Sequence, residues 1–424
     1  MKISVIIPTH NRADSLKCAI DSVLALGDAA EFEVVVVDNN SRDHTRDLIL
    51  SYGGVVRYVF EGSTSFTCAR SAGAANATGA AFLYLDDDVI VKPGALDGVA
   101  RVFREKPACG VIAGHIEPRF VVPPPPWALD CQRSFNGWSL YNPRQIPALR
   151  RELQEVEWAA GPMMAIRTST YNEVGGFPPD TIGVETNRGK GLFSKLYVGP
   201  GDYGLCVKAQ TAGYKVYYSG AVSCEHVIPP VRCTVQFWRS RMIGEAYHAT
   251  TTDREFYRLG PFARARKRIA IQARLLATLA LLRAQLDRAA KDGTEPCPEE
   301  GILAEEMWLE YYKAFLQMDV VLDAYPWLSA FLWEIGKKGV TDANYEVVMA
   351  RLPLEYALLV SDEHVYGTSA IRSVEQFDSV VSRGGEYERE LPRPTRGLRK
   401  LPGLVPAYRL LKSARRRLRR GNGN

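Results

Sequence analysis

Four short apolar runs alternate with helix-like segments across the first 85 residues, and this alternation restricts the fold more than any other feature. The runs cover residues 3–8, 32–38, 55–60 and 81–85 and are rich in β-branched or aromatic residues. The segments between them carry apolar residues at helical spacing or small residues that pack closely on a sheet. A β-α-β-α-β-α-β order predicts an α/β fold with a mostly parallel sheet and helices on both faces.

Polar residues come directly after three of these runs. They are residues 8–12 (PTHNR), residues 38–41 (DNNS) and the consecutive carboxylates Asp86, Asp87 and Asp88. Because parallel sheets bind ligands at the carboxyl ends of their strands, we expect these groups to meet in one crevice. Buried carboxylates need countercharge. A D-x-D pair can share Mg²⁺ or Mn²⁺, which also binds phosphate oxygens; an exposed acidic turn is the alternative.

Three further residues have both a chemical and a structural interpretation. His226 follows the apolar run 214–219. It is either a third metal ligand or a structural histidine. Asp202 begins a predicted helix after a glycine-rich segment, as a general base or as a helix cap. Arg70 lies in the first turn of a predicted helix. Its guanidinium could bind a phosphate or pair with one of the aspartates; a solvated surface position is the alternative.

Charge is distributed unevenly along the chain. The net charge is +5, but residues 391–424 hold eleven Lys and Arg and no acid. Residues 1–390 therefore carry 42 bases and 48 acids, a net charge of −6. No secretory leader is recognisable, and no run approaches the roughly 20 apolar residues that cross a bilayer. Eight cysteines without a C-x-x-C pair suit a reducing cytoplasm.

Together these stretches resemble the inverting glycosyltransferases of family two, which have the GT-A fold. The resemblance covers about residues 1–230 in five ordered blocks: SVIIPTHNR, VVVVDNNSRDHT, CARSAGAANATGAAFLYLDDDV, AAGPMMAIRTSTYNEVGGF and GPGDYGLCVKAQTAGYKVYY. It implies a Rossmann-like sheet with a nucleotide-binding half (about 1–116) and an acceptor-binding half (about 117–230). Beyond residue 230, apolar residues recur at steps of three and four, which predicts a helical region (231–385). The basic tail (386–424) follows it.

The resemblance also implies a role for each matching residue. A nucleotide would be held by Pro8, Thr9, Asn11, Arg12, Asp38, Arg70, Asp86 and Asp87. A divalent cation, Mn²⁺ or Mg²⁺, would be held by Asp86, Asp88 and His226. Asp202 would be the general base that takes the proton from an acceptor hydroxyl. The segments 119–141 and 183–201 would shape the acceptor site, the second as a closing lid.

The expected activity is transfer of a single sugar from a nucleoside-diphosphate sugar, with a uridine nucleotide favoured. Residues 236–241 (QFWRSR) only loosely resemble the Q-x-x-R-W motif of processive polymerases. Two positions depart from the family pattern: Gly201 replaces a Glu, and Gly204 replaces a second Asp. These departures put the acceptor contacts in doubt more than the base.

Two alternatives remain open at this stage. A sugar-phosphate nucleotidyltransferase has a similar sheet, but its glycine-rich first loop is absent because residues 8–12 contain no glycine. A catalytically silent nucleotide-sugar or glycan-binding protein is compatible with Gly201. The release of nucleoside diphosphate from a panel of donors separates the three.

The expected acceptor is a carbohydrate, a lipid-linked sugar or a small molecule. Residues 397–420 interleave leucines with basic residues, which favours attachment to an anionic membrane surface; a solvated terminus is the alternative. Nucleic-acid binding is not expected, because the basic run is terminal and offers only Tyr408 for stacking. We therefore expect a cytoplasmic enzyme, either free in the cytoplasm or peripheral on the inner face of the membrane.

Overall fold

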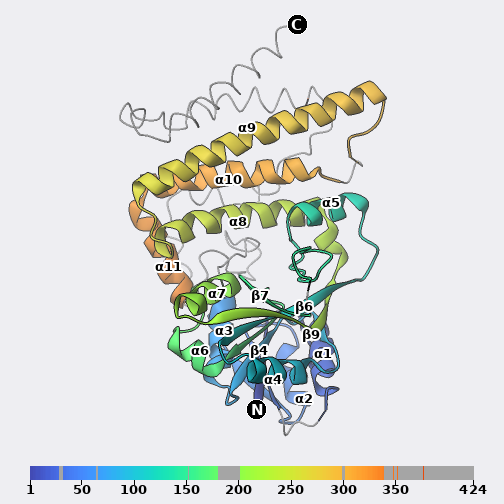
Figure 1. The fold of residues 1–424 in the computed structure, drawn as a ribbon, viewed down its shortest axis with the longest axis vertical. Coiled ribbons are helices and arrows are strands. Elements are labelled where there is room, and N and C mark those ends of the chain that lie inside the picture. Colours follow the sequence, from blue (N-terminus) through green and yellow to red (C-terminus); the bar gives the residue numbers. More distant parts are fainter. Residues whose placement is uncertain are drawn as a thin grey trace.

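The computed structural model describes residues 1–27, 32–63, 65–150, 152–179, 201–297 and 301–338, with Val347, Arg351 and Gln376. These residues form a sheet domain at one end and a stack of helices at the other (Figure 1). The α/β class, the flanking helices and the C-terminal helical region are as the sequence predicts. The glycine-rich segment 183–200 and the basic tail lie outside the described residues.

The elements of the sheet domain follow the predicted order. The strands are β1 (Ile3–Thr9), β2 (Phe32–Asp38), β3 (Val56–Phe60), β4 (Ala81–Leu85), β5 (Val89–Val91), β6 (Cys109–Phe120), β7 (Leu153–Val156), β8 (Met163–Arg167) and β9 (Lys215–Ile228). The helices are α1 (Ala13–Leu24), α2 (Thr45–Ser51), α3 (Phe66–Ala75), α4 (Ala95–Glu105), α5 (Pro126–Ser134), α6 (Thr168–Glu173) and α7 (Gly201–Thr211).

All the strands belong to one mixed sheet of order β3-β2-β1-β4-β8-β6-β9-β5, with β7 paired to β9. The first four strands are parallel, as the β-α-β alternation predicts. β8 then pairs antiparallel with β4 and with β6, so the second half of the sheet runs in both directions. The strands β1, β2 and β4 form the core because their side chains are almost completely buried on both faces, for example Ile6, Val36 and Leu83, whereas the edge strand β3 is partly exposed.

The largest difference from the sequence prediction is the length of β9. The strand continues to Ile228, so His226 lies within it, opposite Val89 of β5, instead of following it. β5 and β6 flank this part of β9, and their pairing with it depends on contacts distant in sequence. The sequence also favours Ser41 as the cap of the helix that follows it, but its hydroxyl accepts a hydrogen bond from the Asn11 amide, and the N-cap residue of α2 is His44.

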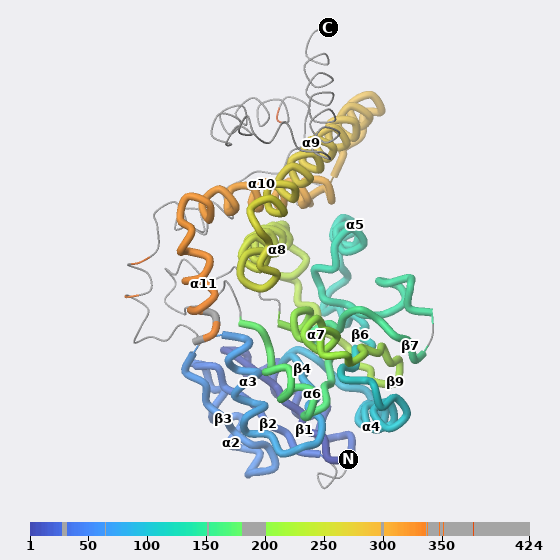
Figure 2. Tube along the Cα trace, turned by 60° about the vertical axis from the view of Figure 1, so that its left-hand side comes forward, coloured from blue at the N-terminus to red at the C-terminus, as the bar shows by residue number. Residues whose placement is uncertain are grey.

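The helical region consists of α8 (Val235–Glu255), α9 (Pro261–Asp292), α10 (Ala304–Ala324) and α11 (Pro326–Lys338), joined to β9 by the short helix η1 (Pro230–Cys233). Figure 2 shows α11 descending from this stack beside α3. α10 meets α5 where Trp308 donates to the Ser134 hydroxyl at 2.7 Å. The helices are therefore packed on the sheet domain at two places, and one of them adjoins the helix that carries Arg70.

Among the described residues, α9 is the one helix that is long and apolar enough by composition to span a membrane. Its best 18-residue window has a mean hydropathy of 1.3, and 22% of that window is buried. The apolar stretch is longer than the sequence suggested, because alanines beyond Arg274 and Arg283 also contribute to it. The helix packs along α10 through Leu282 and Leu286, and composition alone does not separate a packed helix from a membrane span.

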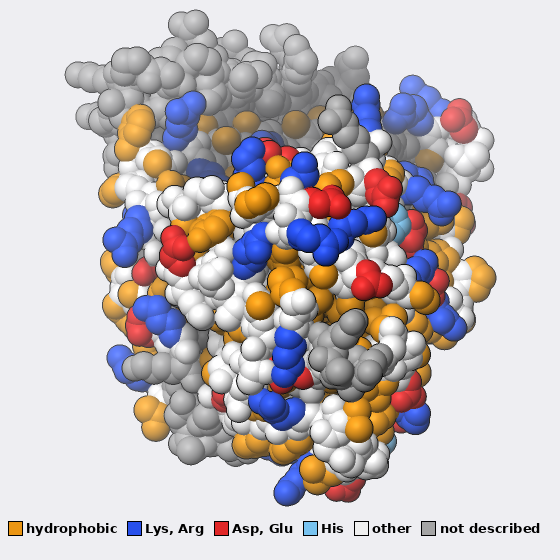
Figure 3. Space-filling model, turned by 60° about the horizontal axis from the view of Figure 1, so that its bottom comes forward, with side chains coloured by type: hydrophobic (Ala, Val, Ile, Leu, Met, Phe, Trp, Pro, Cys, Tyr) orange, Lys and Arg blue, Asp and Glu red, His pale blue; other side chains and the backbone are white. Residues whose placement is uncertain are grey.

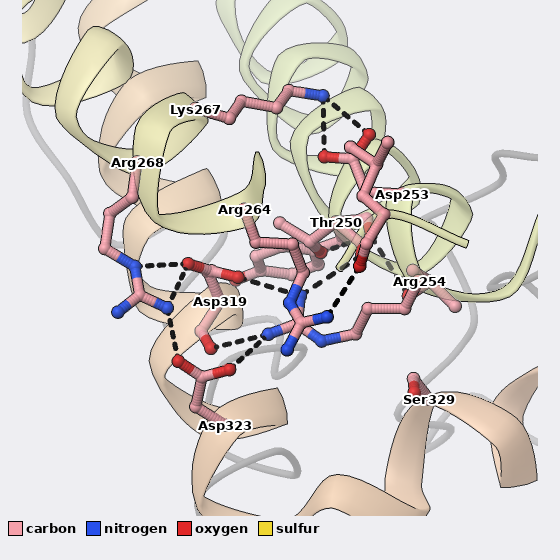
Figure 4. A network of polar contacts seen from close by, with 12 residues as sticks. Thr250, Asp253, Arg254, Arg264, Lys267, Arg268, Asp319, Asp323 and Ser329 are labelled. Carbon is pink, nitrogen blue, oxygen red and sulfur yellow. Dashed lines mark hydrogen bonds and ion pairs between the residues drawn. The ribbon is translucent and has the colours of Figure 1, made fainter. Parts of the chain in front are cut away.

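An ion-pair network between α8, α9 and α10 holds the helical stack together (Figure 4). Buried Asp319 accepts hydrogen bonds from Arg254 and Arg268, and Asp253 pairs with Lys267. On the face of the molecule seen in Figure 3, described basic side chains are interspersed with acidic ones.

Candidate active site

One cavity of about 350 Å³ lies at the carboxyl ends of the strands. The sequence-predicted residues that line it are Pro8, Thr9, Arg12, Arg70, Asp86, Asp87, Asp88, Asp202 and His226. Its volume is within the usual range for a small-ligand site. The structure therefore brings together the N-terminal loop, the three aspartates, the arginine of α3 and the acid of α7, although 190 residues of sequence separate Arg12 from Asp202.

Two predicted nucleotide-binding residues are absent from the lining of this cavity. The Asn11 side chain accepts from the Arg42 amide at 2.7 Å, and its backbone is left-handed with φ 52°. Asp38 is buried at the end of β2, where it accepts from the Ser41 amide and from the Tyr58 hydroxyl. Both residues shape the loops that carry the cavity lining.

Arginines largely neutralise the aspartate cluster. The sequence interpretation assigned this countercharge to a divalent cation. Arg12 donates to Asp87 Oδ1 at 2.7 Å and to Asp88 Oδ2 at 2.9 Å. Arg70 donates to Asp86 Oδ1 at 3.2 Å, and Arg232 donates to Asp88 Oδ2 at 2.8 Å. The three aspartates therefore do not need a metal ion as countercharge, because arginines supply it. A cation can still bind beside them.

Burial and pairing separate the pKa values of the three acids. Burial raises the pKa of Asp87 to about 7, although Arg12 opposes this, and it also raises the pKa of Asp86 against the pull of Arg70. Burial acts in the same direction on Asp88, but His226, Arg232 and Arg12 together hold the pKa of Asp88 well below its ordinary value. Of the three acids, Asp88 is thus the one whose charged form the surroundings stabilise.

Arg70 is completely buried, so the solvated alternative is wrong. Its guanidinium stacks over the Phe66 ring at 3.8 Å, and its Nη2 also donates to the Gly161 carbonyl. Its Nε and Nη1 have no hydrogen-bond partner among the described residues. A buried cation with unused N–H groups at the cavity floor can receive an anionic group of a ligand.

Asp202 lies in the first turn of α7, and no described residue forms a hydrogen bond or ion pair with its carboxylate. Gly161 separates it from Arg70: a Cβ there would lie 2.8 Å from both Arg70 Nη2 and Asp202 Oδ2. A half-buried carboxylate without a partner, held at a helix start, is available to accept a proton.

A divalent cation fits two of the three predicted ligands. Asp88 Oδ1 is buried without a hydrogen bond, and it lies 3.2 Å from His226 Nε2. Among the described residues no group of three His, Cys, Asp or Glu is placed to hold a metal. Asp86 is instead paired with Arg70. A cation here would complete its shell with water or phosphate oxygens, as Mg²⁺ usually does.

The helical region contributes lining residues that the sequence interpretation missed. They are Phe237, Arg241 and Glu245 of α8, together with Arg232 of η1 and Phe66 of α3. The QFWRSR stretch was the only local signal for α8. Arg232 lies in an ordinary proline-rich turn, and only the packing of η1 against β9 brings it to Asp88.

Comparisons with known proteins agree with the resemblance. The sequence model described as Glycosyl transferase family 2 matches residues 4–175. An uncharacterized glycosyltransferase of Nostoc sp. is 37% identical over 116 residues, 26% of this chain and 36% of that protein. A validoxylamine A glucosyltransferase of Streptomyces hygroscopicus subsp. jinggangensis is 37% identical over 102 residues, 23% of this chain and 24% of that protein. The chain thus matches about a third or less of the length of these relatives.

Two solved structures have lower similarity. The mannosyltransferase PcManGT from Pyrobaculum calidifontis, in complex with GDP-Man and Mn²⁺, is 18% identical, with a TM-score of 0.43 over 87% of this chain and 88% of that chain. GalNAc-T7 with UDP, GalNAc and Mn²⁺ is 16% identical, with a TM-score of 0.40 over 60% of this chain and 50% of that chain.

Proposed function

We propose that this protein, whose residues 4–175 match the sequence model of glycosyl transferase family 2, is an inverting glycosyltransferase that moves a single sugar from a nucleoside-diphosphate sugar to an acceptor hydroxyl. The observation that carries the proposal is the arrangement of the cavity. The carboxylate of Asp202, which has no partner among the described residues, faces the same 350 Å³ space as the arginine and aspartate cluster. This combination provides a proton acceptor beside groups that hold a diphosphate.

Each residue has a chemical task in this proposal. Asp202 takes the proton of the acceptor hydroxyl while that oxygen attacks the anomeric carbon from the face opposite the leaving group. A single displacement of this kind inverts the configuration. Arg70, through its free Nη1, and Arg12 stabilise the negative charge that develops on the nucleoside diphosphate. The hexose class of the sugar and a uridine nucleotide remain part of the proposal.

We further propose a divalent cation, Mn²⁺ or Mg²⁺, as the cofactor. Asp88 and His226 are the residues that would hold it, with Asp86 nearby but paired with Arg70. When bound, the cation would act as a Lewis acid toward the diphosphate.

The decisive experiment measures nucleoside diphosphate released from UDP-, GDP- and ADP-sugars, with Mn²⁺ or Mg²⁺ and a panel of free-sugar, lipid-linked and alcohol acceptors. The proposal expects acceptor-dependent release that is lost in Asp202→Asn. Pyrophosphate release from a nucleoside triphosphate and a sugar phosphate would identify a nucleotidyltransferase. Nucleotide-sugar binding by calorimetry with no release for any acceptor would favour a silent binding protein, the alternative that Gly201 motivates.

The cellular location is also a proposal. We propose a cytoplasmic protein attached to the inner face of the membrane by the basic tail, residues 391–424. Its eleven basic residues favour an anionic surface, and such a position suits a lipid-linked acceptor.

A further inference from the structure

The guanidinium of Arg232 lies between the two residues that are best placed to hold a cation. Its Nη1 is 2.7 Å from His226 Nε2, and its Nη2 donates to Asp88 Oδ2 at 2.8 Å. The same side chain therefore spans Asp88 and His226, and its two N–H groups point to one atom of each. No feature of the sequence singles out this arginine.

Hydrogen bonding determines the protonation of His226. Its Nδ1 lies 2.9 Å from the Trp138 carbonyl oxygen, which only accepts, so Nδ1 carries the proton. A guanidinium only donates, so Nε2 must accept from Arg232 through its lone pair. A neutral imidazole whose Nδ1–H is tied to a carbonyl presents Nε2 in the form that metal ions bind.

Asp88 Oδ1 and His226 Nε2 form what we call the Asp88–His226 pair. The two atoms are 3.2 Å apart, and among the described residues Oδ1 has no hydrogen-bond partner. Two ligands bound at about 2.1 Å and at right angles to one cation lie about 3.0 Å apart. The separation of the pair is close to that value.

We infer that Arg232 occupies the place of a divalent cation at the Asp88–His226 pair, so that a cation binds there only when the guanidinium leaves. This rests on the cation proposed above but not on sugar transfer. Departure is sterically feasible because the Arg232 side chain is 23% exposed. Its backbone stays anchored, since Trp138 Nε1 donates to the Arg232 carbonyl at 2.9 Å.

Arg12 has a different position at the same carboxylate. It donates to Asp88 Oδ2 and to Asp87, and no contact links it to His226. Arg12 and Arg232 therefore share the Oδ2 oxygen of Asp88, whereas of these two arginines only Arg232 also contacts His226. Removing Arg232 frees the Nε2 atom of His226 and leaves the site more negative, and each change favours a cation.

The test is a titration of Mn²⁺ into the full-length protein without any sugar donor, with free Mn²⁺ measured by electron paramagnetic resonance. Arg232→Met keeps the apolar stem and should bind Mn²⁺ about tenfold or more tightly than wild type, because a guanidinium no longer occupies His226 Nε2 and Asp88 Oδ2. Arg241→Met is the matched control, since Arg241 lines the same cavity but pairs with Glu245 at 3.0 Å. It should keep an affinity near that of wild type.

Two additional variants decide where the ion binds. Adding Asp88→Asn or His226→Gln to Arg232→Met should abolish the gain; a gain that persists means the ion lies elsewhere and overturns the inference. Equal or weaker Mn²⁺ binding by Arg232→Met also overturns it. If Arg232→Met melts at a much lower temperature, Arg232→Lys replaces it, because an ammonium cannot span both ligands and should give an intermediate gain. Mn²⁺ affinity is independent of turnover, so a failure here is distinguishable from a failure of the proposed activity.

Discussion

Arg70 donates from its buried Nη2 to Asp86 Oδ1 at 3.2 Å, which ties helix α3 to the carboxyl end of β4. The pair places a cation and an anion at the floor of the cavity, with two further N–H groups of Arg70 unused. Gly161 lies directly beside the Arg70 guanidinium and the Asp202 carboxylate, so the space around this glycine sets their separation.

Gly161→Ala should lower the transfer rate about 100-fold, because its Cβ would lie 2.8 Å from Arg70 Nη2 and Asp202 Oδ2 and must displace at least one of them. Steady-state kinetics with the best donor and acceptor measure the effect. Gly201→Ala is the matched control, since its Cβ would meet nothing closer than 3.7 Å. Its loss should be much smaller. Equal rates for the two variants would show that the spacing of Arg70 and Asp202 is unimportant.

Asp202→Asn should keep nucleotide-sugar affinity but lose transfer by about 10²–10⁴-fold, because an amide cannot accept the hydroxyl proton. Calorimetry measures the affinity, and nucleoside diphosphate release measures the rate. A variant that turns over as fast as wild type would place the base on another residue. A variant that loses affinity as well would assign Asp202 a role in donor binding.

Glu33→Gln should lower the free energy of unfolding by about 2 kcal/mol at pH 7. Burial opposes ionisation of Glu33, but hydrogen bonds from Ser4 and Thr78 and the charge of Lys2 lower its pKa to about 2. A lowered pKa stabilises the fold above about pH 4.3 and loses that effect as the pH falls toward 2. The gap between the variant and wild type should therefore shrink in acid.

Urea unfolding at pH 7 and pH 3 measures this gap, with exposed Glu105→Gln as the control that should change little. A gap of the same size at both pH values would mean that shape, and not charge, makes Glu33 important.

Asp319→Ala should destabilise the helical stack by about 3 kcal/mol, because it removes the buried carboxylate of Arg254 and Arg268 and leaves them only the more exposed Asp323 (Figure 4). Asp323→Ala is the control: its side chain is 41% exposed, so the loss should be about 1 kcal/mol or less. Chemical denaturation followed by tryptophan fluorescence compares them. Similar losses would mean that solvent reaches Asp319 as well.

Full-length protein should sediment with vesicles of rising anionic lipid content, and added salt should weaken the binding. A version ending at Glu390 should bind much less, because each basic residue near the surface contributes about 1 kcal/mol. Equal binding by the two versions would exclude the tail as the anchor and direct attention to the exposed apolar surface of α9, which both retain.

Much of the sheet domain could be predicted from the sequence because its signals are local. β1, β2, β3 and β4 are short apolar runs, and in β1, β2 and β4 the pattern reports burial directly. The edge strand β3 is partly exposed although its run is apolar. The second half of the sheet was harder, since the pairing of β8 and β9 with distant strands leaves only a weak trace in the sequence. The extension of β9 through His226 is the clearest case.

The sequence by itself determined the α/β alternation, the place of the three aspartates at a strand end and the family resemblance that points to Asp202, because each depends on residues near one another in the chain. Only the tertiary structure decided what neutralises those aspartates. Arg12 and Arg232 are 220 residues apart, yet both donate to Asp88. Hydrogen bonds and charge pairs act over a few ångströms in space, so their partners emerge only when the chain is folded.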